Sequence, residues 1–387
     1  MSIFYRQVKD FSSNALPMFI AIMVTGLLDI QNSINNPVND ILDNIINSRE
    51  LRIVLSRLMW SVIQIVPAFG FGLASDHHRR IKILMVSHIL GITTISLLYW
   101  FQSLHWTFLA VGFLFNPFSI CRATLLDNYP QISAIAIVAT TFIARNVFWI
   151  FLDLFPEGFS SNILLWLVGA LIVSLFILYF KTKDRYENAQ IRKKLEAQSK
   201  INLIRKNTFP LTLSILGLVF AETSFYVLWI LLESFGHSVE SWLKVTTSGA
   251  LLGALIPVFF LRGKAIRDLK NSITTLYLIA AIVGFVCVFL FTQTHVPFQI
   301  NRIGIISLIG GIYLSLVSEY LIAAAGSERK AVGSAFSELS DMIALFLSSL
   351  ITIFISFIQL NVFIIFIIAF GLAALLQFFS EKRVVCL

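Results

Sequence analysis

The chain has few charged residues and few cysteines for its length. Of its 387 residues, 13% are Asp, Glu, Lys or Arg and 57% are hydrophobic, and the mean hydropathy is +0.85. A soluble domain has about 25% charged residues, so this composition excludes an ordinary soluble protein and places most of the chain in a lipid bilayer. The three cysteines, at positions 121, 287 and 386, show no CxxC spacing, which predicts neither a disulfide framework nor a zinc site.

The motifs of several function classes are also missing. No GxxxxGK[ST] phosphate-binding loop occurs, and the nearest string, LRGKAI at 261–266, lacks the hydroxyl residue and a preceding glycine run. The sequence has no histidine-rich metal cluster and no paired catalytic carboxylates beside a nucleophile. We therefore expect no enzyme, no cofactor and no resident metal. The net charge of +8 reflects basic cytoplasmic segments and gives no reason to expect nucleic acid as a partner.

Long apolar segments dominate the rest of the chain. About twelve of them approach the roughly 20 residues that a helix needs to cross about 30 Å of hydrocarbon. They lie at 13–36, 53–75, 81–102, 106–127, 131–153, 162–181, 208–233, 241–262, 271–293, 302–325, 331–357 and 360–381. Backbone groups in lipid must hydrogen-bond within their own segment, so these spans should be helices. The predicted fold class is an all-α membrane protein with twelve transmembrane helices.

One polar stretch divides the spans six and six. The basic linker 182–207 separates an N-terminal half, 1–181, from a C-terminal half, 208–387. Most of the 29 lysines and arginines lie in this linker, in both tails and in the connections on the same side, and the positive-inside rule assigns that side to the cytoplasm. We therefore expect both termini in the cytoplasm and a first span that is retained, because no cleavage pattern precedes it.

The turn between the second and third spans combines a glycine, an aspartate and a basic cluster. Its sequence is GFGLASDHHRRIK, and the features that matter are Gly72, Asp76, Arg79, Arg80 and Lys82. Gly72 allows close helix contact, Asp76 is expected to cap the third span, and the cations hold the turn at the cytoplasmic face. The residues fit two interpretations, a turn that favours one conformation of the protein and a turn that only anchors the helices.

This turn resembles the signature loop of the major facilitator superfamily of secondary transporters. In that loop a glycine, three residues, an aspartate and a basic cluster occupy the same place, although here His77 replaces the usual cation and Arg79 replaces the second glycine. Twelve spans, a six-plus-six division and cytoplasmic termini extend the resemblance over the whole chain. It implies two six-helix halves, a central cavity lined by helices one, four, seven and ten, and transport by alternating access.

Ionisable side chains within the spans are costly in lipid and are candidates for function. Asp29 and Asn32 share a polar face of the first span, and Glu222 and Tyr226 share a face of the seventh. If the two halves are repeats, as the resemblance implies, each half presents one acidic group to the central cavity.

The two halves differ in the sign of their buried charges. Aligning the hairpin of spans four and five with that of spans ten and eleven places Arg122 opposite Glu319, and Arg145 one position from Asp341. Two interpretations remain open: the charges pair across the interface as an inner gate, or they contact a substrate that has both a carboxylate and an amine. We assign Arg122, Glu338 and Asp341 to the gate, and Arg145 and Glu319 to the substrate.

These residues favour a secondary active transporter for a small polar solute that is carboxylate-bearing or zwitterionic. The coupling proton would be taken up by Asp29, Glu222 or Glu319. The alternative is a proton-driven exporter of drugs or siderophores, although the fifth span lacks the proline of drug antiporters. A membrane-embedded enzyme would need a catalytic constellation, and a non-transporting sensor would be expected to lose its cavity charges. The expected partners are a small-molecule substrate, protons and lipid, with a monomeric chain in a bacterial inner membrane.

Overall fold

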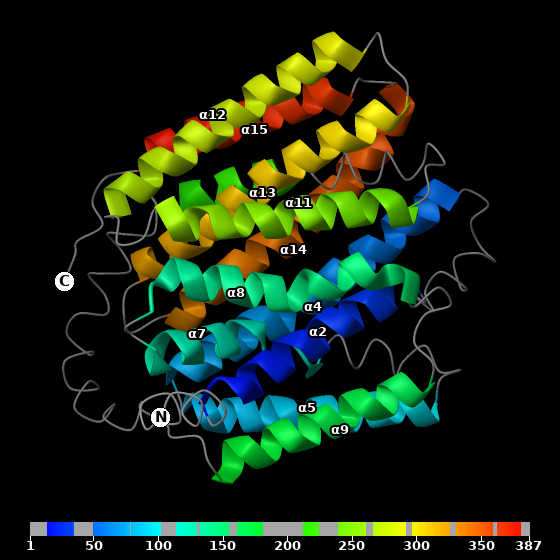
Figure 1. Cartoon of the computed structure of the whole chain (residues 1–387), viewed down its shortest axis with the longest axis vertical. Helices are drawn as coiled ribbons and strands as arrows, with labels where there is room; N and C mark the ends of the chain where they lie inside the picture. The colour runs from blue at the N-terminus through cyan, green and yellow to red at the C-terminus, as the bar shows by residue number, and fades with distance from the viewer. Residues whose placement is uncertain are drawn as a thin grey trace, which may run out of the picture.

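Helices make up all the regular structure in the described part of the chain. The structure, a computed structural model, describes residues 14–34, 49–77, 79–101, 114–129, 132–154, 161–180, 212–223, 239–260, 266–291, 296–325, 330–358 and 362–380. The elements are α2 (Leu16–Ile34), α4 (Arg49–His77), α5 (Arg80–Trp100), α7 (Phe118–Asn128), α8 (Ala134–Asn146), the 3-10 helix η1 (Val147–Leu154), α9 (Ser161–Phe180), α11 (Val239–Phe260), α12 (Ile266–Phe291), α13 (Val296–Ala325), α14 (Lys330–Ile358) and α15 (Val362–Phe379) (Figure 1). A further helix covers Thr212–Thr223.

The predicted all-α fold is confirmed, because each of the twelve predicted spans contains a helix among the described residues. Four helical segments are long and apolar enough to cross a membrane, namely Arg80–Trp100, Ala134–Phe151, Asn162–Phe180 and Lys330–Ile351. Shorter apolar helices occupy Leu16–Ile30, Val62–Ser75, Thr212–Thr223, Lys244–Phe260, Ser307–Ala323 and Ile364–Phe379.

The fourth span, predicted over 106–127 with Pro117 inside it, is interrupted within its described part. Its described part includes three buried, non-helical residues at 115–117, and α7 begins only at Phe118. Pro117 explains the break, since proline has no N–H to donate and disfavours the helical conformation of the residue before it, Asn116. The N-terminus of α7 therefore lies inside the molecule.

The expectation that Asp76 caps the third span is wrong. α4 continues through Asp76 to His77, so this aspartate belongs to the last turn of α4. α5 begins at Arg80, and its N-cap residue, Arg79, makes no side-chain capping hydrogen bond.

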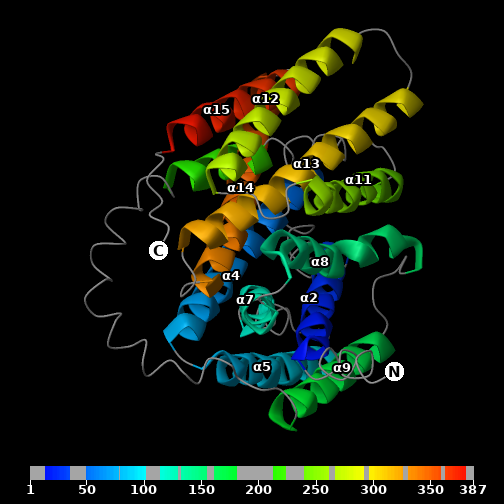
Figure 2. The same cartoon turned by 60° about the vertical axis from the view of Figure 1, so that its left-hand side comes forward.

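The helices are arranged along the long axis of the molecule. α12 and α15 lie at one extreme, α5 and α9 lie at the other, and the remaining labelled helices lie between them (Figures 1 and 2). We refer to α2 through α9 as the N-terminal helices and to Thr212–Thr223 together with α11 through α15 as the C-terminal helices. The two groups meet in the middle, where α14 packs on α4 and α7, and α8 packs on α11 and α13.

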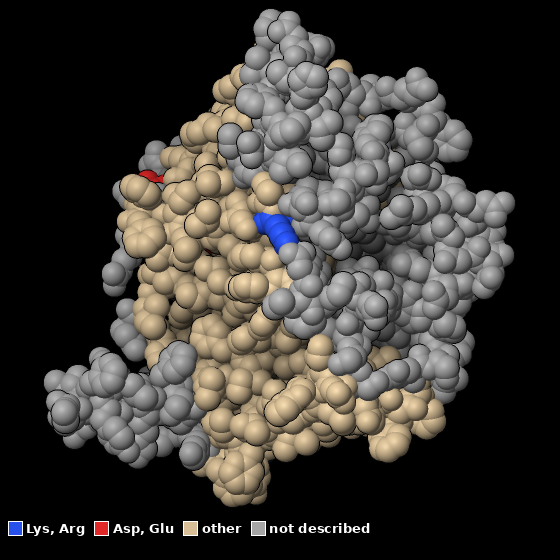
Figure 3. Space-filling model, turned by 45° about the vertical axis from the view of Figure 1, so that its right-hand side comes forward, with Lys and Arg blue, Asp and Glu red and all other residues tan. Residues whose placement is uncertain are grey.

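The distribution of apolar and charged side chains is the reverse of that in a soluble protein. Large apolar side chains are exposed on the outside, among them Trp166, which is 79% exposed, and Phe259, which is 78% exposed. The described surface in Figure 3 has very little Lys, Arg, Asp or Glu. Charged side chains such as Arg80 and Arg122 are instead buried. This distribution is what a lipid environment requires, because apolar atoms face hydrocarbon and polar groups find partners inside.

Two glycines allow the helices to approach closely. A Cβ at Gly26 in α2 would collide with the main-chain oxygen of Arg145 in α8, and a Cβ at Gly72 in α4 would lie 2.6 Å from the Cβ of Ala335 in α14. Asp29 follows Gly26 by about one turn of helix. The absence of a side chain at Gly26 therefore brings Asp29 within reach of Arg145.

Replacing Gly26 by alanine should push α2 and α8 apart and destabilise the protein by about 1–3 kcal/mol, the usual cost of overpacking. Thermal and denaturant unfolding of the purified protein in detergent would measure the change. Gly169→Ala is the matched control, since no atom lies within 4 Å of a Cβ added there. Equal stability of the two variants would contradict the close contact.

Candidate functional site

Arg145, in the last turn of α8, is the centre of a buried polar network. Its Nε donates to Oδ2 of Asp29 in α2 at 2.9 Å, and its Nη1 donates to Oε1 of Glu338 in α14, also at 2.9 Å. The Glu338 side chain is 1% exposed and that of Arg145 is 11% exposed. One guanidinium thus forms ion pairs with two carboxylates on two other helices, which offsets part of the cost of removing these groups from water.

One neutral amide, that of Asn116, also binds Glu338, and a second amide, that of Gln64, holds Asn116. Nδ2 of Asn116 donates to Oε1 of Glu338 at 2.7 Å and to Oε1 of Gln64 at 2.9 Å. Asn116 and Arg145 belong to the N-terminal helices and their connections, whereas Glu338 belongs to the C-terminal helices. We call the bonds from Arg145 and Asn116 to Glu338 the Glu338 bridge.

Arg122 in α7 is held differently. Its Nε donates to Oγ1 of Thr141 at 3.0 Å, and its guanidinium carbon lies 4.3 Å from the centre of the Phe118 ring. Arg145 lies 4.9 Å from the same ring centre, so one aromatic ring interacts with two cations. Arg122 is 3% exposed and forms no ion pair with the residues that the structure describes, although Glu338 attracts it from a distance.

A pair of carboxyl groups lies among the C-terminal helices. Glu222 is 3% exposed, and the carboxyl group of Asp341 lies close enough to repel it, with Tyr277 nearby. Neither carboxyl oxygen of Glu222 has a hydrogen-bond partner among the described residues, and a bond between the two carboxyl groups would need a proton on one of them, because two carboxylates offer only acceptors. The pair is therefore suited to hold a single proton. Glu319 in α13 has a buried carboxyl oxygen that lacks a hydrogen-bond partner.

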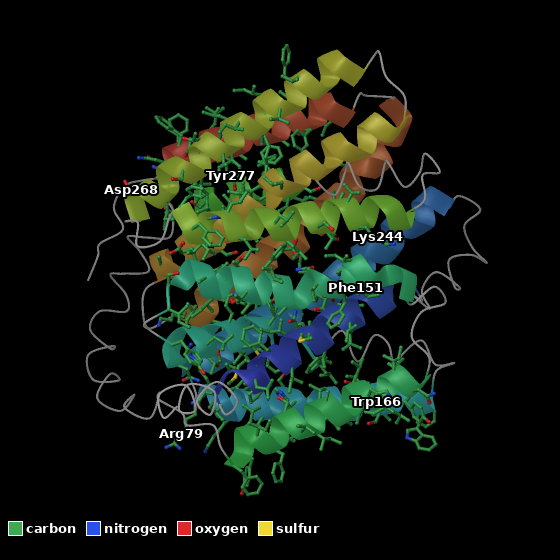
Figure 4. All side chains as sticks on the ribbon, viewed as in Figure 1. Arg79, Phe151, Trp166, Lys244, Asp268 and Tyr277 are labelled. Carbon is green, nitrogen blue, oxygen red and sulfur yellow. The ribbon has the colours of Figure 1, made fainter. Side chains whose placement is uncertain are left out.

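A second ionic contact joins the two groups of helices. It lies beside the start of α5, on the side of the molecule where Figure 4 shows Arg79. Asp127, at the end of α7, forms ion pairs with Arg80 of α5 and with Lys330 of α14, both at 2.9 Å. The Lys330 ammonium also donates to the main-chain oxygen of Leu126 at 3.3 Å. We call Arg80, Asp127 and Lys330 the Asp127 triad.

The structure brings together many of the site residues that the sequence predicts. Arg145 is paired with Asp29 and Glu338, and Glu222 lies close to Asp341. The acid partner expected for Arg122 belongs instead to Arg145, and the gate and substrate roles of these residues stay predictions. The side chains of Asn32 and Asp76 and all of Tyr226 lie outside the described residues.

Sequence reasoning missed four residues of the network: Gln64, Asn116, Asp127 and Lys330. The two amides carry no charge, so a search for buried charges passes over them. The two charged residues fall at the ends of predicted spans, where charges are expected anyway. His88 is a packed, hydrogen-bonded group, since its ring nitrogens lie 2.8 Å from the Leu84 oxygen and from Oγ of Ser174. The described residues contain no cluster that could hold a metal.

Solved structures share this arrangement of helices, although no family model and no curated protein matches the sequence. The human organic anion transporter MFSD10 (TETRAN) superposes with a TM-score of 0.69 at 12% identity, over 96% of this chain and 99% of that one. The fucose:proton symporter FucP of E. coli gives 0.61 at 10% identity, over 96% and 100%. A structure of FucP in the outward conformation, described as a major facilitator superfamily transporter, gives 0.60 at 9% identity, over 96% and 100%.

The chain therefore has the fold of the major facilitator superfamily transporters, as the turn at 70–82 implied. A chain with this fold is an integral, multi-pass membrane protein, so the network around Arg145 is enclosed by helices that span a bilayer.

The Arg145–Glu338 pair should show strong energetic coupling. Arg145→Gln leaves two buried carboxylates without their cation and should cost about 3–5 kcal/mol. Adding Glu338→Gln should recover part of that loss, because the amide needs no cation, and the double-mutant cycle should give a coupling of about 0.5–3 kcal/mol. Denaturant unfolding in detergent measures each stability.

The matched control for this cycle is Arg122→Gln combined with Glu338→Gln. Arg122 forms no ion pair with Glu338, so its coupling should be smaller than that of Arg145. Additive effects of Arg145→Gln and Glu338→Gln would contradict the bridge.

Proposed function

We propose that this protein is a secondary active transporter that moves a small polar solute with an anionic group by alternating access. The observation that carries the proposal is the Glu338 bridge, a buried ionic contact between the N-terminal and C-terminal helices of a transporter fold. Alternating access needs two groups of helices that rock against each other around a central site. An ionic contact suits such an interface, because a proton or a competing anion can release it.

Arg122 supports a solute that bears a carboxylate. A buried guanidinium without an acidic partner is costly, and an anion from the solute would offset that cost. The similar human structure is that of an organic anion transporter, which agrees with this class of solute. Glu319, with its unpartnered carboxyl oxygen, is the proposed contact for an amine if the solute is zwitterionic.

The Glu222–Asp341 pair is the proposed site of the coupling proton. A buried carboxyl group close to a second, partly buried one favours the uptake of one proton, because ionisation of both would place like charges together. Loss of that proton would strengthen the attraction of Asp341 for Arg145, with which it interacts. Proton movement would thereby reach the Glu338 bridge. Asp29 remains a second candidate, and the similar FucP structure is that of a proton symporter.

The proposed topology follows the charge distribution of the sequence. Residues 1–181 and 208–387 would form the two halves, with the linker 182–207 and both termini in the cytoplasm. The Asp127 triad would then lie at the cytoplasmic end, where its cross-contact and the turn with Gly72 and Arg80 hold the two halves together. We propose a monomer in a bacterial inner membrane as the working unit.

Glu222→Gln should uncouple solute movement from the proton gradient. A thermal-shift screen of the purified protein against a metabolite library identifies the solute, and proteoliposomes then measure its transport. Glu222→Gln should abolish accumulation driven by a pH gradient, whereas solute exchange at equal pH should continue, because exchange requires no net proton movement.

Glu222→Asp is the matched control, since it keeps an ionisable group at the same place and should retain part of the accumulation. Accumulation by Glu222→Gln at the wild-type level would exclude this carboxyl pair as the coupling site.

A further inference from the structure

The break in the fourth span places a helix N-terminus deep among buried side chains. Phe115 is 2% exposed and Asn116 is 0% exposed, and the eleven residues of α7 follow from Phe118. Asn116 binds Glu338, and the Phe118 ring lies against Arg145 and Arg122. The first turn of α7 is thus part of the network around Arg145.

Main-chain N–H groups in this first turn lack acceptors. The Phe118 N–H donates to Oδ1 of Asn116 at 3.4 Å. The N–H groups of Ser119 and Ile120 make no hydrogen bond within the described part of the chain, and regular bonding along α7 begins at the Cys121 N–H. Unpaired N–H groups and the helix dipole make such an end attractive to anions.

An independent feature of the same place also favours an anion. The guanidinium of Arg122 lies over Phe118, the first residue of α7, and is anchored through its Nε by Thr141. Its two terminal nitrogens make no hydrogen bond to the described residues, and the residue is 3% exposed. A buried cation whose terminal donors make no hydrogen bond to the described residues therefore lies against the side chain of the first residue of α7, the helix whose next two N–H groups have no described acceptor.

We propose that Arg122 and the first turn of α7 form the subsite for the anionic group of the solute, a carboxylate or another oxyanion. This inference rests on the proposed transport function and names the residues that recognise its substrate. Arg145 serves a different purpose, because two of its nitrogens already bind Asp29 and Glu338.

The subsite has an internal competitor in Glu338. Its carboxylate is held by Asn116, immediately before Pro117 and α7, and it is the carboxylate that attracts Arg122. Its second oxygen, Oε2, has no hydrogen-bond partner. A solute anion at Arg122 would repel Glu338 and weaken the Glu338 bridge. Solute binding and separation of the two groups of helices would then be linked, so that each changes the free energy of the other.

Binding of a simple anion to the purified full chain tests the subsite. The probe is benzoate, and benzamide is its uncharged counterpart of the same shape; ligand-observed NMR and calorimetry measure both. Wild type should bind benzoate more tightly than benzamide. Arg122→Gln should weaken benzoate binding at least tenfold, and Arg122→Lys should lie between the two, because lysine keeps the charge without the planar donors.

Removal of the competing carboxylate at Glu338 should raise the affinity for benzoate, whereas the Arg122 variants lower it. Glu338→Gln should bind benzoate several-fold more tightly than wild type, and Arg122→Gln added to it should remove that gain. Lys244→Gln is the control for loss of one positive charge, since Lys244 belongs to α11 and not to the site around Arg122 and α7; Figure 4 shows it on the side of the molecule opposite to Arg79 and Asp268. It should bind as wild type does.

Unchanged benzoate affinity in Arg122→Gln, or equal binding of benzoate and benzamide by wild type, would overturn the subsite. Failure of Glu338→Gln to tighten binding would overturn the competition. If Arg122→Gln does not fold, Arg122→Lys and Glu338→Gln decide the question. Binding that follows Arg122 in a protein that transports nothing in liposomes would sink the proposed function alone, whereas transport without a benzoate effect of Arg122 would sink this inference alone.

Discussion

The ion pair between Arg145 and Glu338 is the contact on which the rest of this structure depends. Both side chains are largely buried, so either charge without its partner would strongly destabilise the protein. Its geometry needs a helix that approaches closely, which Gly26 provides, and a donor that orients the carboxylate, which Asn116 provides. Together these residues position three helices, α2, α8 and α14, against one another. The N-terminal and C-terminal helices meet through a charge pair that can be broken without disturbing either group internally.

The two ionic contacts between the N-terminal and C-terminal helices involve different positions along α14. Lys330 begins α14, and Glu338 follows it eight residues later, or about 12 Å along the axis. The Asp127 triad thus joins the helices at one end, and the Glu338 bridge joins them further inside. Between these levels, Gly72 allows α4 to pack closely on Ala335 of α14. Separation of the helices at that end must therefore release the Asp127 triad, the contact of Gly72 with Ala335 and the Glu338 bridge together.

The sequence predicts the spans well and the pairing of charges poorly, and both outcomes have physical reasons. Hydrocarbon demands long apolar helices, so composition alone locates every span. The break at 115–117 has one signal in the sequence, Pro117, which indicates a kink but does not determine that α7 begins only at Phe118. Asn116 and Gln64 escape notice because they are neutral. Whether Arg122 or Arg145 pairs with Glu338 depends on how two helices are rotated about their axes, which spacing along the chain does not determine.

The distance between the two groups of helices tests the central claim most directly. Spin labels at Phe180 and Phe379, the exposed last residues of α9 and α15, would report it by double electron–electron resonance in a variant without native cysteines. If Glu338 holds the two groups together, Glu338→Gln should shift the distribution toward longer distances, and Arg145→Gln should do the same. Identical distributions in wild type and both variants would contradict the account.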